Sequence, residues 1–427
     1  MTDNHISQDF SDPKANIGTS QKLSLKSFGP GILMASAAIG GSHLVASTQA
    51  GALYGWQLAI MIVLANVFKY PFYRFATEYT YSTGESLVAG YAKKSPAYLW
   101  AFFILCIVSG IISTGAVSIL CAVILGYMLP FELNTLALSA IIMASSWLLL
   151  FAGHYKLLDS LTKWIIISLT AATIAAVFIA AGKPSAIDPN FIPDSPWNLA
   201  ALGFIIALMG WMPAPLEFSA ITSVWTAKKI RTDHTSRFQG MVDFNVGFLT
   251  SAILALFFLA MGVFVQYGTG QEIIMQGGGY VGQLIQMYTQ TIGSWSKMFV
   301  AFIAFLCMYG TVITCADGYG RANAESLSLI TTKTTQATEK YVMLWTTLTV
   351  IGGYILIAFF SGQMAALLKF AMITAFVTAP IFAYLNYTLA KSEGTLSRGM
   401  NIYALAGIVF LSGFTVLFLL QFFKIIG

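Results

Sequence analysis

The chain has 427 residues, of which 57% are hydrophobic and only 9% are charged, and its mean hydropathy is +0.76. Soluble domains carry about 25% charged residues, so this composition excludes an ordinary soluble protein and predicts several membrane-spanning helices. The net charge of +5 does not indicate a nucleic-acid partner, because the basic residues lie in loops between apolar segments, where they report topology. An enzyme is not expected and no cofactor is predicted, since phosphate-loop, kinase, zinc-hydrolase and Ser-His-Asp patterns do not occur.

Apolar segments of spanning length follow one another along most of the chain. Residues 1–25 are polar, contain no signal peptide and are predicted to form a disordered cytoplasmic tail. A spanning helix needs about 20 mostly apolar residues, and this rule predicts about eleven spans. They lie near residues 27–52, 57–80, 97–127, 134–152, 160–182, 198–225, 241–267, 295–320, 341–360, 364–390 and 401–424.

The lysine and arginine residues predict the orientation of these spans. If the N-terminus is cytoplasmic, eighteen of them, counting Lys69, fall on the inner side, and only Lys183, Lys297 and Lys424 fall outside. This excess places the N-terminus inside and, with an odd number of spans, the C-terminus outside. The expected location is a bacterial-type inner (plasma) membrane, where the lipid bilayer surrounds a monomer.

Two of the spans carry helix breakers at their middle. The first contains Gly40 and Gly41, and the second contains Pro213-Ala214-Pro215. Glycine weakens a helix through its backbone freedom, and proline removes a donor. Chance breakers occur in membrane helices, but freed backbone groups are tolerated there only where they line a cavity or are buried in protein. The two breaks fall in spans one and six, the first members of two five-span halves of opposite orientation.

These halves predict an all-α membrane protein with a LeuT-type five-plus-five inverted repeat. The expected transporter core covers residues 26–390, with one repeat over about 26–182 and the other over about 198–390, and residues 400–427 form an additional eleventh helix. Matching interruptions in two halves are the best sequence indicator of a transporter binding site, expected here near the bilayer midplane between the breaks.

Several short strings resemble a known family. Gly29-Pro30-Gly31, the string from Gln49 to Trp56 (QAGALYGW), Met212-Pro213 and Asp243 are similar to the Nramp (natural resistance-associated macrophage protein) divalent-metal transporters, and the similarity runs from about 25 to 390. The resemblance implies the fold and a transport function.

The metal site of that family is altered here. Its first-helix Asp and Asn correspond to Gly40 and His43, and the histidine of its Met-Pro-His motif corresponds to Ala214. Its methionine ligand corresponds to Met212, and its carbonyl ligand would belong to Met209. The third span also lacks the acids that the family uses for protons. The chain is therefore similar to divergent members that lack the usual metal site.

The residues at the two breaks are the candidate substrate ligands, and these are Gly40, Gly41, Ser42, His43, Met209, Trp211, Met212 and Ala214. His43 and Met212 are the candidate metal ligands, because imidazole and thioether groups suit transition metals. His43 also titrates near neutral pH and is a candidate for proton coupling; the alternative is a structural hydrogen bond to unwound carbonyls. Trp211 either packs in the core or stacks on an organic ligand.

Four further charged positions are singled out. Glu217 lies one turn beyond Pro213, and an ionisable residue within the membrane is a functional hypothesis by default; it is a proton-coupling candidate or a structural hydrogen-bonding group. Asp317 and Arg321 have the spacing of a helical ion pair, and together with Asp243 they are gating or structural candidates near the inner face. Lys369 either snorkels outward or replaces a coupling cation by a fixed charge.

The predicted function is secondary transport of a divalent cation by alternating access. Hard divalent ions prefer carboxylates and the first break has none, so the expected ion is hydrated Mg²⁺ rather than Mn²⁺ or Fe²⁺. A proton-coupled carrier of a small organic solute is the alternative, since helix N-termini at the breaks could bind a carboxylate. A membrane sensor that no longer transports is a third reading.

Overall fold

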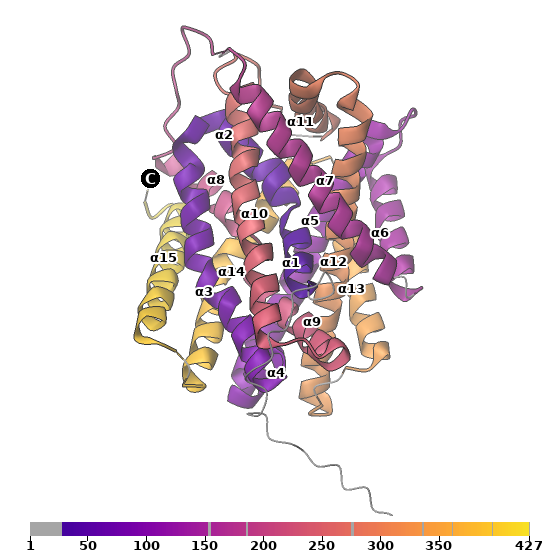
Figure 1. Ribbon diagram of the computed structural model, residues 1–427, viewed down its shortest axis with the longest axis vertical. Helices are drawn as coiled ribbons and strands as arrows, with labels where there is room; N and C mark the ends of the chain where they lie inside the picture. The colour runs from indigo at the N-terminus through magenta and orange to yellow at the C-terminus, as the bar shows by residue number, and fades with distance from the viewer. Residues whose placement is uncertain are drawn as a thin grey trace, which may run out of the picture.

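The computed structural model describes residues 28–152, 155–184, 187–274, 277–334, 337–360, 362–394 and 396–426, and within these residues it contains helices and no strand. The tail predicted over residues 1–25 lies outside the described residues. The all-α fold predicted from composition is therefore confirmed, and Figure 1 shows the helices packed as one upright bundle.

The helices fall into two successive sets. The first set is α1 (Pro30–Ala38), the π-helix η2 (Ser42–Ser47), α2 (Thr48–Tyr54), the 3₁₀ helix η3 (Gly55–Leu58), α3 (Ala59–Thr83), α4 (Leu87–Lys94), α5 (Pro96–Met128), α6 (Thr135–Phe151) and α7 (Tyr155–Ala181). The second set is α8 (Leu199–Gly210), α9 (Phe218–Asp233), α10 (Arg237–Val265), α11 (Gly277–Ile292), α12 (Ser296–Thr331), α13 (Glu339–Phe359) and α14 (Met364–Ser392), and α15 (Arg398–Phe422) follows.

Each predicted span coincides with helix. Among the described residues, seven helical segments are long and apolar enough to cross a membrane by themselves, and three shorter apolar helices accompany them: Thr135–Phe151, Ile167–Ala181 and Leu199–Gly210. Spans one and six are the two that break, into α1 followed by η2–α2 and into α8 followed by α9. Their pieces are short because the glycines and prolines at their middle end each first half, as the sequence indicated.

The second set repeats the order of the first. A broken helix is followed by a long helix, α3 or α10, then by a short helix, α4 or α11, and then by a second long helix, α5 or α12. The two short helices lie at opposite ends of the bundle in Figure 1, as an inverted repeat requires. The span rule missed both, because it searches only for long apolar segments and α4 and α11 have 8 and 16 residues.

Helix α10 crosses both halves of the first broken helix at glycines. A Cβ at Gly31 would lie 2.2 Å from the carbonyl oxygen of Asp243, and one at Gly247 would lie 2.2 Å from the carbonyl oxygen of Gly31. The same holds further along, where a Cβ at Gly51 would lie 2.0 Å from the Leu259 oxygen. Small residues of this kind let membrane helices approach closely, so α1 and α2 are fixed against one neighbour on both sides of their break.

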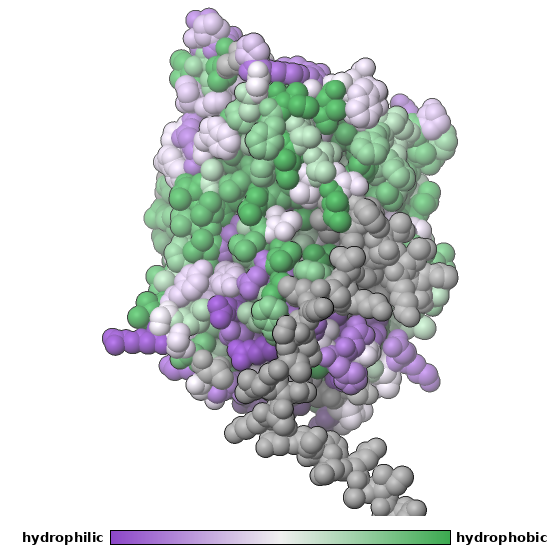
Figure 2. Space-filling model, viewed as in Figure 1, coloured by the Kyte–Doolittle hydropathy of each residue, from purple (hydrophilic) through white to green (hydrophobic). Residues whose placement is uncertain are grey.

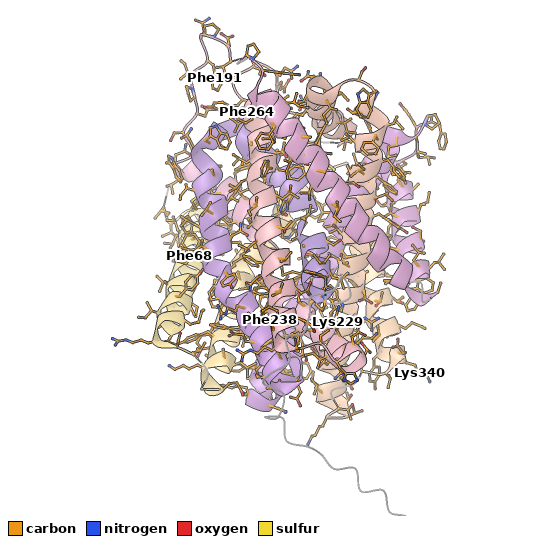
Figure 3. All side chains as sticks on the ribbon, in the orientation of Figure 1. Phe68, Phe191, Lys229, Phe238, Phe264 and Lys340 are labelled. Atoms are coloured by element: carbon orange, nitrogen blue, oxygen red, sulfur yellow. The ribbon has the colours of Figure 1, made fainter. Side chains whose placement is uncertain are left out.

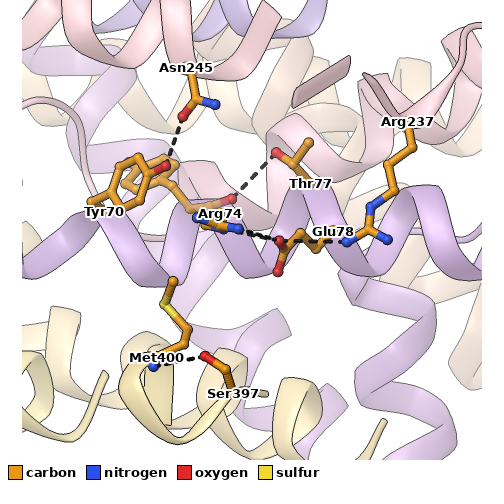
Figure 4. Close-up of polar contacts among 9 residues, drawn as sticks. Tyr70, Arg74, Thr77, Glu78, Arg237, Asn245, Ser397 and Met400 are labelled. Atoms are coloured by element: carbon orange, nitrogen blue, oxygen red, sulfur yellow. Dashed lines mark hydrogen bonds and ion pairs between the residues drawn. The ribbon is translucent and has the colours of Figure 1, made fainter. Parts of the chain in front are cut away.

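A second connection joins α10 to α3 near one end of the bundle. Glu78 accepts from Arg74, at 2.9 Å between Nη2 and Oε1, and lies 3.7 Å from Arg237 of α10. Tyr70 of α3 donates to Asn245 Oδ1 at 2.8 Å, and Figure 4 shows both contacts. Exposed pairs of this kind stabilise little individually, but they tie together two helices that flank the breaks.

The surface agrees with a membrane-embedded bundle. Figure 2 shows a green apolar belt around the middle and more purple, polar residues toward the two ends. In Figure 1, α1 begins below the middle of the bundle, and the C-terminus lies in the upper half. Lys229 and Lys340 lie at the lower end in Figure 3. We call this the basic end, and the positive-inside rule predicts that it is cytoplasmic.

Candidate substrate site between the two breaks

The first break is a short unwound stretch closed by side chains of α12. Helix α1 ends at Ala38, and after Gly41 the chain continues as the π-helix η2. The Cys307 thiol donates to the carbonyl oxygen of Ile39 at 2.7 Å, and the Thr311 hydroxyl donates to that of Ser36 at 3.2 Å. These two groups are one turn apart on α12 and neutral, so they satisfy freed carbonyls without bringing a charge.

His43 lies just beyond this break and is fully buried. Its Nε2 lies 2.8 Å from the carbonyl oxygen of Ser251 on α10, and since a carbonyl only accepts, Nε2 carries a hydrogen. Its Nδ1 lies 2.8 Å from the Ser42 hydroxyl, which is also 2.6 Å from the Ala38 oxygen. Both ring nitrogens are therefore engaged, by a carbonyl of α10 and by the Ser42 hydroxyl, rather than by the unwound carbonyls that the structural alternative named.

The second break is closed by a cation from α3. The ammonium of Lys69 donates to the carbonyl oxygens of Met209 and Gly210, both at 2.8 Å, and to that of Ala214 at 3.3 Å. Tyr73, one turn further along α3, donates to the Pro215 oxygen at 2.5 Å. The C-terminal end of α8 has negative partial charge, so the Lys69 ammonium both satisfies and neutralises it.

Lys69 corrects the topology assignment made from the sequence. It was counted with the basic residues of the inner loops, but it is fully buried within α3. The sequence did indicate this burial, because Lys69 lies inside the apolar span 57–80, and a lysine at membrane depth is costly and needs a partner. Lys369, by contrast, is exposed on α14.

Glu217 lies at the start of α9 and is also fully buried. The Tyr319 hydroxyl of α12 lies 2.9 Å from its Oε1, while Oε2 has no hydrogen-bond partner in the described part of the chain. Tyr319 lies 3.4 Å from the Ser113 hydroxyl of α5 as well. Glu217 and Lys69 interact electrostatically, but within the described residues their charged atoms are not within the 4.0 Å of a direct ion pair.

A small cavity lies between the two breaks. Its volume is about 20 Å³, which is room for about one water molecule. Its lining comes from both breaks and from α5 and α12: Ala37, Ala38, Gly41, Ser42, Ser113, Val117, Trp211, Ala214, Pro215, Phe218, Thr311 and Cys315. No side chain in this lining carries a charge. The indole nitrogen of Trp211 is buried and has no hydrogen-bond acceptor among the described residues.

The structure divides the predicted substrate ligands into two groups. Gly41, Ser42, Trp211 and Ala214 line the cavity, and the indole of Trp211 packs on Gly41, where a Cβ would lie 2.8 Å from the ring. The remaining four do not line it: Gly40, His43, Met209 and Met212. The carbonyl of Met209, which the resemblance implied as a metal ligand, accepts from Lys69 instead.

The described residues contain no group of three or more His, Cys, Asp or Glu side chains that could hold a metal ion. His43 therefore belongs to no such group in the described part of the chain. A transition metal at the breaks would rely on hydroxyls, thiol and backbone oxygens, which is a weak set for a divalent ion.

Comparisons with known proteins agree with this fold. The sequence model of the "Natural resistance-associated macrophage protein-like" family (Nramp) matches residues 31–421. The chain belongs to the Nramp family. A curated relative, an uncharacterised protein of Pasteurella multocida (strain Pm70), is 49% identical over 397 residues, which is 92% of each chain.

Solved structures show the same fold at low sequence identity. A mutant of the Eremococcus coleocola manganese transporter is similar with a TM-score of 0.65 and 16% identity, over 92% of this chain and 85% of that one. Mhp1, a nucleobase-cation-symport-1 family transporter, is similar with a TM-score of 0.59 and 13% identity, over 90% of each chain. MhsT in complex with L-phenylalanine is similar with a TM-score of 0.57 and 12% identity, over 93% of this chain and 100% of that one. The LeuT-type fold predicted for this Nramp protein is confirmed.

On the side of the basic end, this Nramp chain has a vestibule of about 880 Å³. Leu33 of α1 borders the vestibule, and Ala37, one turn further, lines the cavity. Asp317 and Arg321 border it on α12, where Arg321 Nε lies 2.8 and 3.0 Å from the two Asp317 oxygens. Trp225 of α9 donates to Asp317 Oδ2 at 3.1 Å. The predicted ion pair therefore exists and links α9 to α12 beside the vestibule.

Asp243, the third gating candidate, holds the beginning of α1. Its Oδ1 accepts from the Gly29 N–H at 3.1 Å and its Oδ2 from the Gly31 N–H at 2.8 Å. Helix α1 has no cap from its own Gly29, so a carboxylate of α10 satisfies its first donors and complements its dipole. Asp243 is thus placed to anchor the first half of the broken helix.

Proposed function

We propose that this Nramp protein is a secondary-active transporter that binds its cargo between the two breaks and moves it by alternating access. The observation that carries the proposal is the placement of both interrupted helices around one buried cavity. Irregular backbone at membrane depth is characteristic of transporter binding sites. The vestibule beside the basic end supplies an aqueous approach, and the Asp317–Arg321–Trp225 contacts are the candidate gate.

The site's own chemistry supports a small organic solute best. A divalent ion would have to bind beside the buried ammonium of Lys69, without any carboxylate in the cavity wall. An organic solute needs hydrogen-bond donors and apolar contacts instead, and Trp211, Ser113 and Phe218 supply both. The cavity of about 20 Å³ is collapsed around this chemistry, so such a solute enters only when the helices move apart.

A divalent cation is the second candidate substrate, and family membership and the similarity to a manganese transporter favour it. A partly hydrated ion such as Mg²⁺ keeps several waters and needs few protein ligands. The hydroxyl of Ser42 and the backbone at the first break would be its contacts.

The two candidates are separated by binding to the purified protein. A specific ligand stabilises the folded state, so thermal unfolding with MgCl₂, MnCl₂ and a set of small organic solutes identifies the substrate class. We expect weak or no stabilisation by Mn²⁺. Strong stabilisation by either divalent ion, without any by the organic set, would establish the second candidate.

A redesigned first break tests the reasoning about Mn²⁺. Gly40→Asp with His43→Asn restores the residue types of the family, but a Cβ at Gly40 lies 2.9 Å from Thr311 Oγ1, and Lys69 still holds the Met209 carbonyl. We therefore expect the double variant to gain little Mn²⁺ affinity and the triple variant with Lys69→Met to gain at least about tenfold. Equal affinity in the two variants would show that Lys69 does not exclude the ion.

A further inference from the structure

We propose that the cargo is a small organic monocarboxylate and that Glu217 takes up one proton with each anion. This inference rests on the proposed transport through the cavity and adds the chemical class of the cargo and its coupling. It follows from the charges around the two breaks, from the donors in the cavity wall and from the connection between Glu217 and that wall.

The first step concerns the charges. The second break holds an ammonium that donates to three carbonyls, whereas the first break uses neutral groups for the same purpose, the Cys307 thiol and the hydroxyls of Thr311 and Ser42. The Lys69 nitrogen donates three hydrogen bonds, as an ammonium does, and therefore brings a positive charge to one side of the cavity. A buried charge requires a balancing charge, because an unpaired one is costly in a medium of low dielectric constant.

The second step concerns what faces the cavity. Helix α9, with 16 residues, begins at Phe218 in the cavity wall. Its first N–H groups, on Phe218, Ser219 and Ala220, donate to carbonyls of the preceding turn, so α9 acts on an anion in the cavity through the positive end of its dipole. Trp211, which is 5% exposed, lines the same cavity, and its buried indole N–H has no acceptor among the described residues. A carboxylate oxygen in the cavity would accept from this donor, and no acidic side chain in the wall would repel it.

The third step identifies the proton carrier. Glu217 is the acid that acts electrostatically on Lys69. Groups that face it are Lys69 and Tyr73 on α3, Cys106 on α5, and Cys315 and Tyr319 on α12. Tyr319 lies between Glu217 Oε1 and the Ser113 hydroxyl of the cavity wall. The carboxylate is thus connected to the cavity by two side-chain hydroxyls. Its Oε2 has no hydrogen-bond partner among the described residues and can take a proton beside Ser109 of α5.

The charges then couple the two ligands. With Glu217 ionised, its charge balances Lys69, and an added carboxylate would leave one negative charge unbalanced. With a proton on Glu217 Oε2, the Lys69 charge is unbalanced and the carboxylate neutralises it. One proton and one anion therefore bind together and cross together, so that the step carries no net charge.

The test uses the purified full-length protein and four monocarboxylates, acetate, lactate, benzoate and N-acetylglycine, each paired with its uncharged amide. Thermal stabilisation reports binding, and a pH-sensitive dye reports proton uptake. We expect at least one carboxylate to stabilise the protein while its amide does not, with one proton taken up per anion. Its affinity should fall about tenfold per pH unit on the alkaline side of the Glu217 titration, because binding of the two is linked.

Variants assign these effects to residues. Glu217→Gln should bind the carboxylate without proton uptake and without the pH dependence, whereas Glu78→Gln, in the contact network between α3 and α10, should behave like the wild type. Lys69→Met should lose at least about tenfold in carboxylate affinity, and Lys369→Met, which removes an exposed lysine, should not. If Lys69→Met does not fold, Lys69→Arg, which keeps the charge, should retain carboxylate binding. The number of protons that the wild type takes up per anion tests the coupling independently of these variants.

Several results would overturn the inference. It is wrong if no carboxylate stabilises the protein more than its amide, or if Glu217→Gln still takes up one proton per anion. If MgCl₂ or MnCl₂ stabilises the protein and none of the carboxylates does, the carboxylate is not the cargo, but the proposed transport function still stands. If neither class of cargo enters proteoliposomes under an imposed gradient, the proposed function itself fails.

Discussion

Replacing Gly210 by alanine tests whether the second break depends on contact between two backbones. Gly210 ends α8, and a Cβ there would lie 1.8 Å from the carbonyl oxygen of Met372 and 2.7 Å from its carbonyl carbon, both in α14. Backbone atoms cannot rotate away as a side chain can, so the two helices would have to separate by roughly 1 Å. Overpacking of a close-packed interior costs typically about 1–3 kcal/mol and occasionally more, and we expect at least about 3 kcal/mol here.

The same substitution at Gly413 is the matched control. A Cβ at that position meets no atom within 4 Å, and Gly413 lies inside α15. Alanine is favoured over glycine in a helix by about 0.8–1.0 kcal/mol, so Gly413→Ala should be neutral or slightly stabilising. Denaturant unfolding of both variants in the same detergent gives the comparison. A free energy of unfolding of Gly210→Ala within about 0.5 kcal/mol of the wild type would refute the reasoning.

Three further outcomes are expected. Asp243→Ala leaves two backbone donors of α1 without their acceptor and should lower the free energy of unfolding by about 1–2 kcal/mol; an unchanged value would show that water replaces the cap. Because the native cysteines are all buried, Lys228→Cys should react with an impermeant thiol reagent from the cytoplasm and Gln271→Cys from outside, and the reverse would defeat the topology. Arg321→Gln should speed modification of Cys315 in the cavity wall, and an unchanged rate would exclude its ion pair from gating.

The fold of this protein could be predicted largely from its sequence, because the signals are local. The apolar segments located the spans, since their length is set by the bilayer. Gly40 and Gly41 lie in or beside the unwound stretch of span one, and Pro213 lies in that of span six. The pairing of Asp317 with Arg321 followed in the same way from spacing along one helix.

The chemistry of the site was decided by contacts between distant parts of the chain. Lys69 is 140 residues from Met209, whose carbonyl it neutralises, and counting charges along the chain assigned it to a loop. His43 was a candidate ligand by residue type, but Ser251, 208 residues away, engages its Nε2. Sequence alone could flag each as an ionisable residue at membrane depth, but not name its partner.

The fold could be predicted from the sequence and the partners of the buried charges could not, and this difference has one physical cause. Helix formation, helix breaking and membrane insertion depend on the properties of neighbouring residues, so the order of residues determines them. The balance of buried charges depends on distances in three dimensions. The packing of α3, α9 and α12 sets the distances between Lys69, Glu217 and Tyr319. The sequence therefore determined that two broken helices exist, and the tertiary structure decided that one of them holds an ammonium beside a cavity whose wall carries no charge.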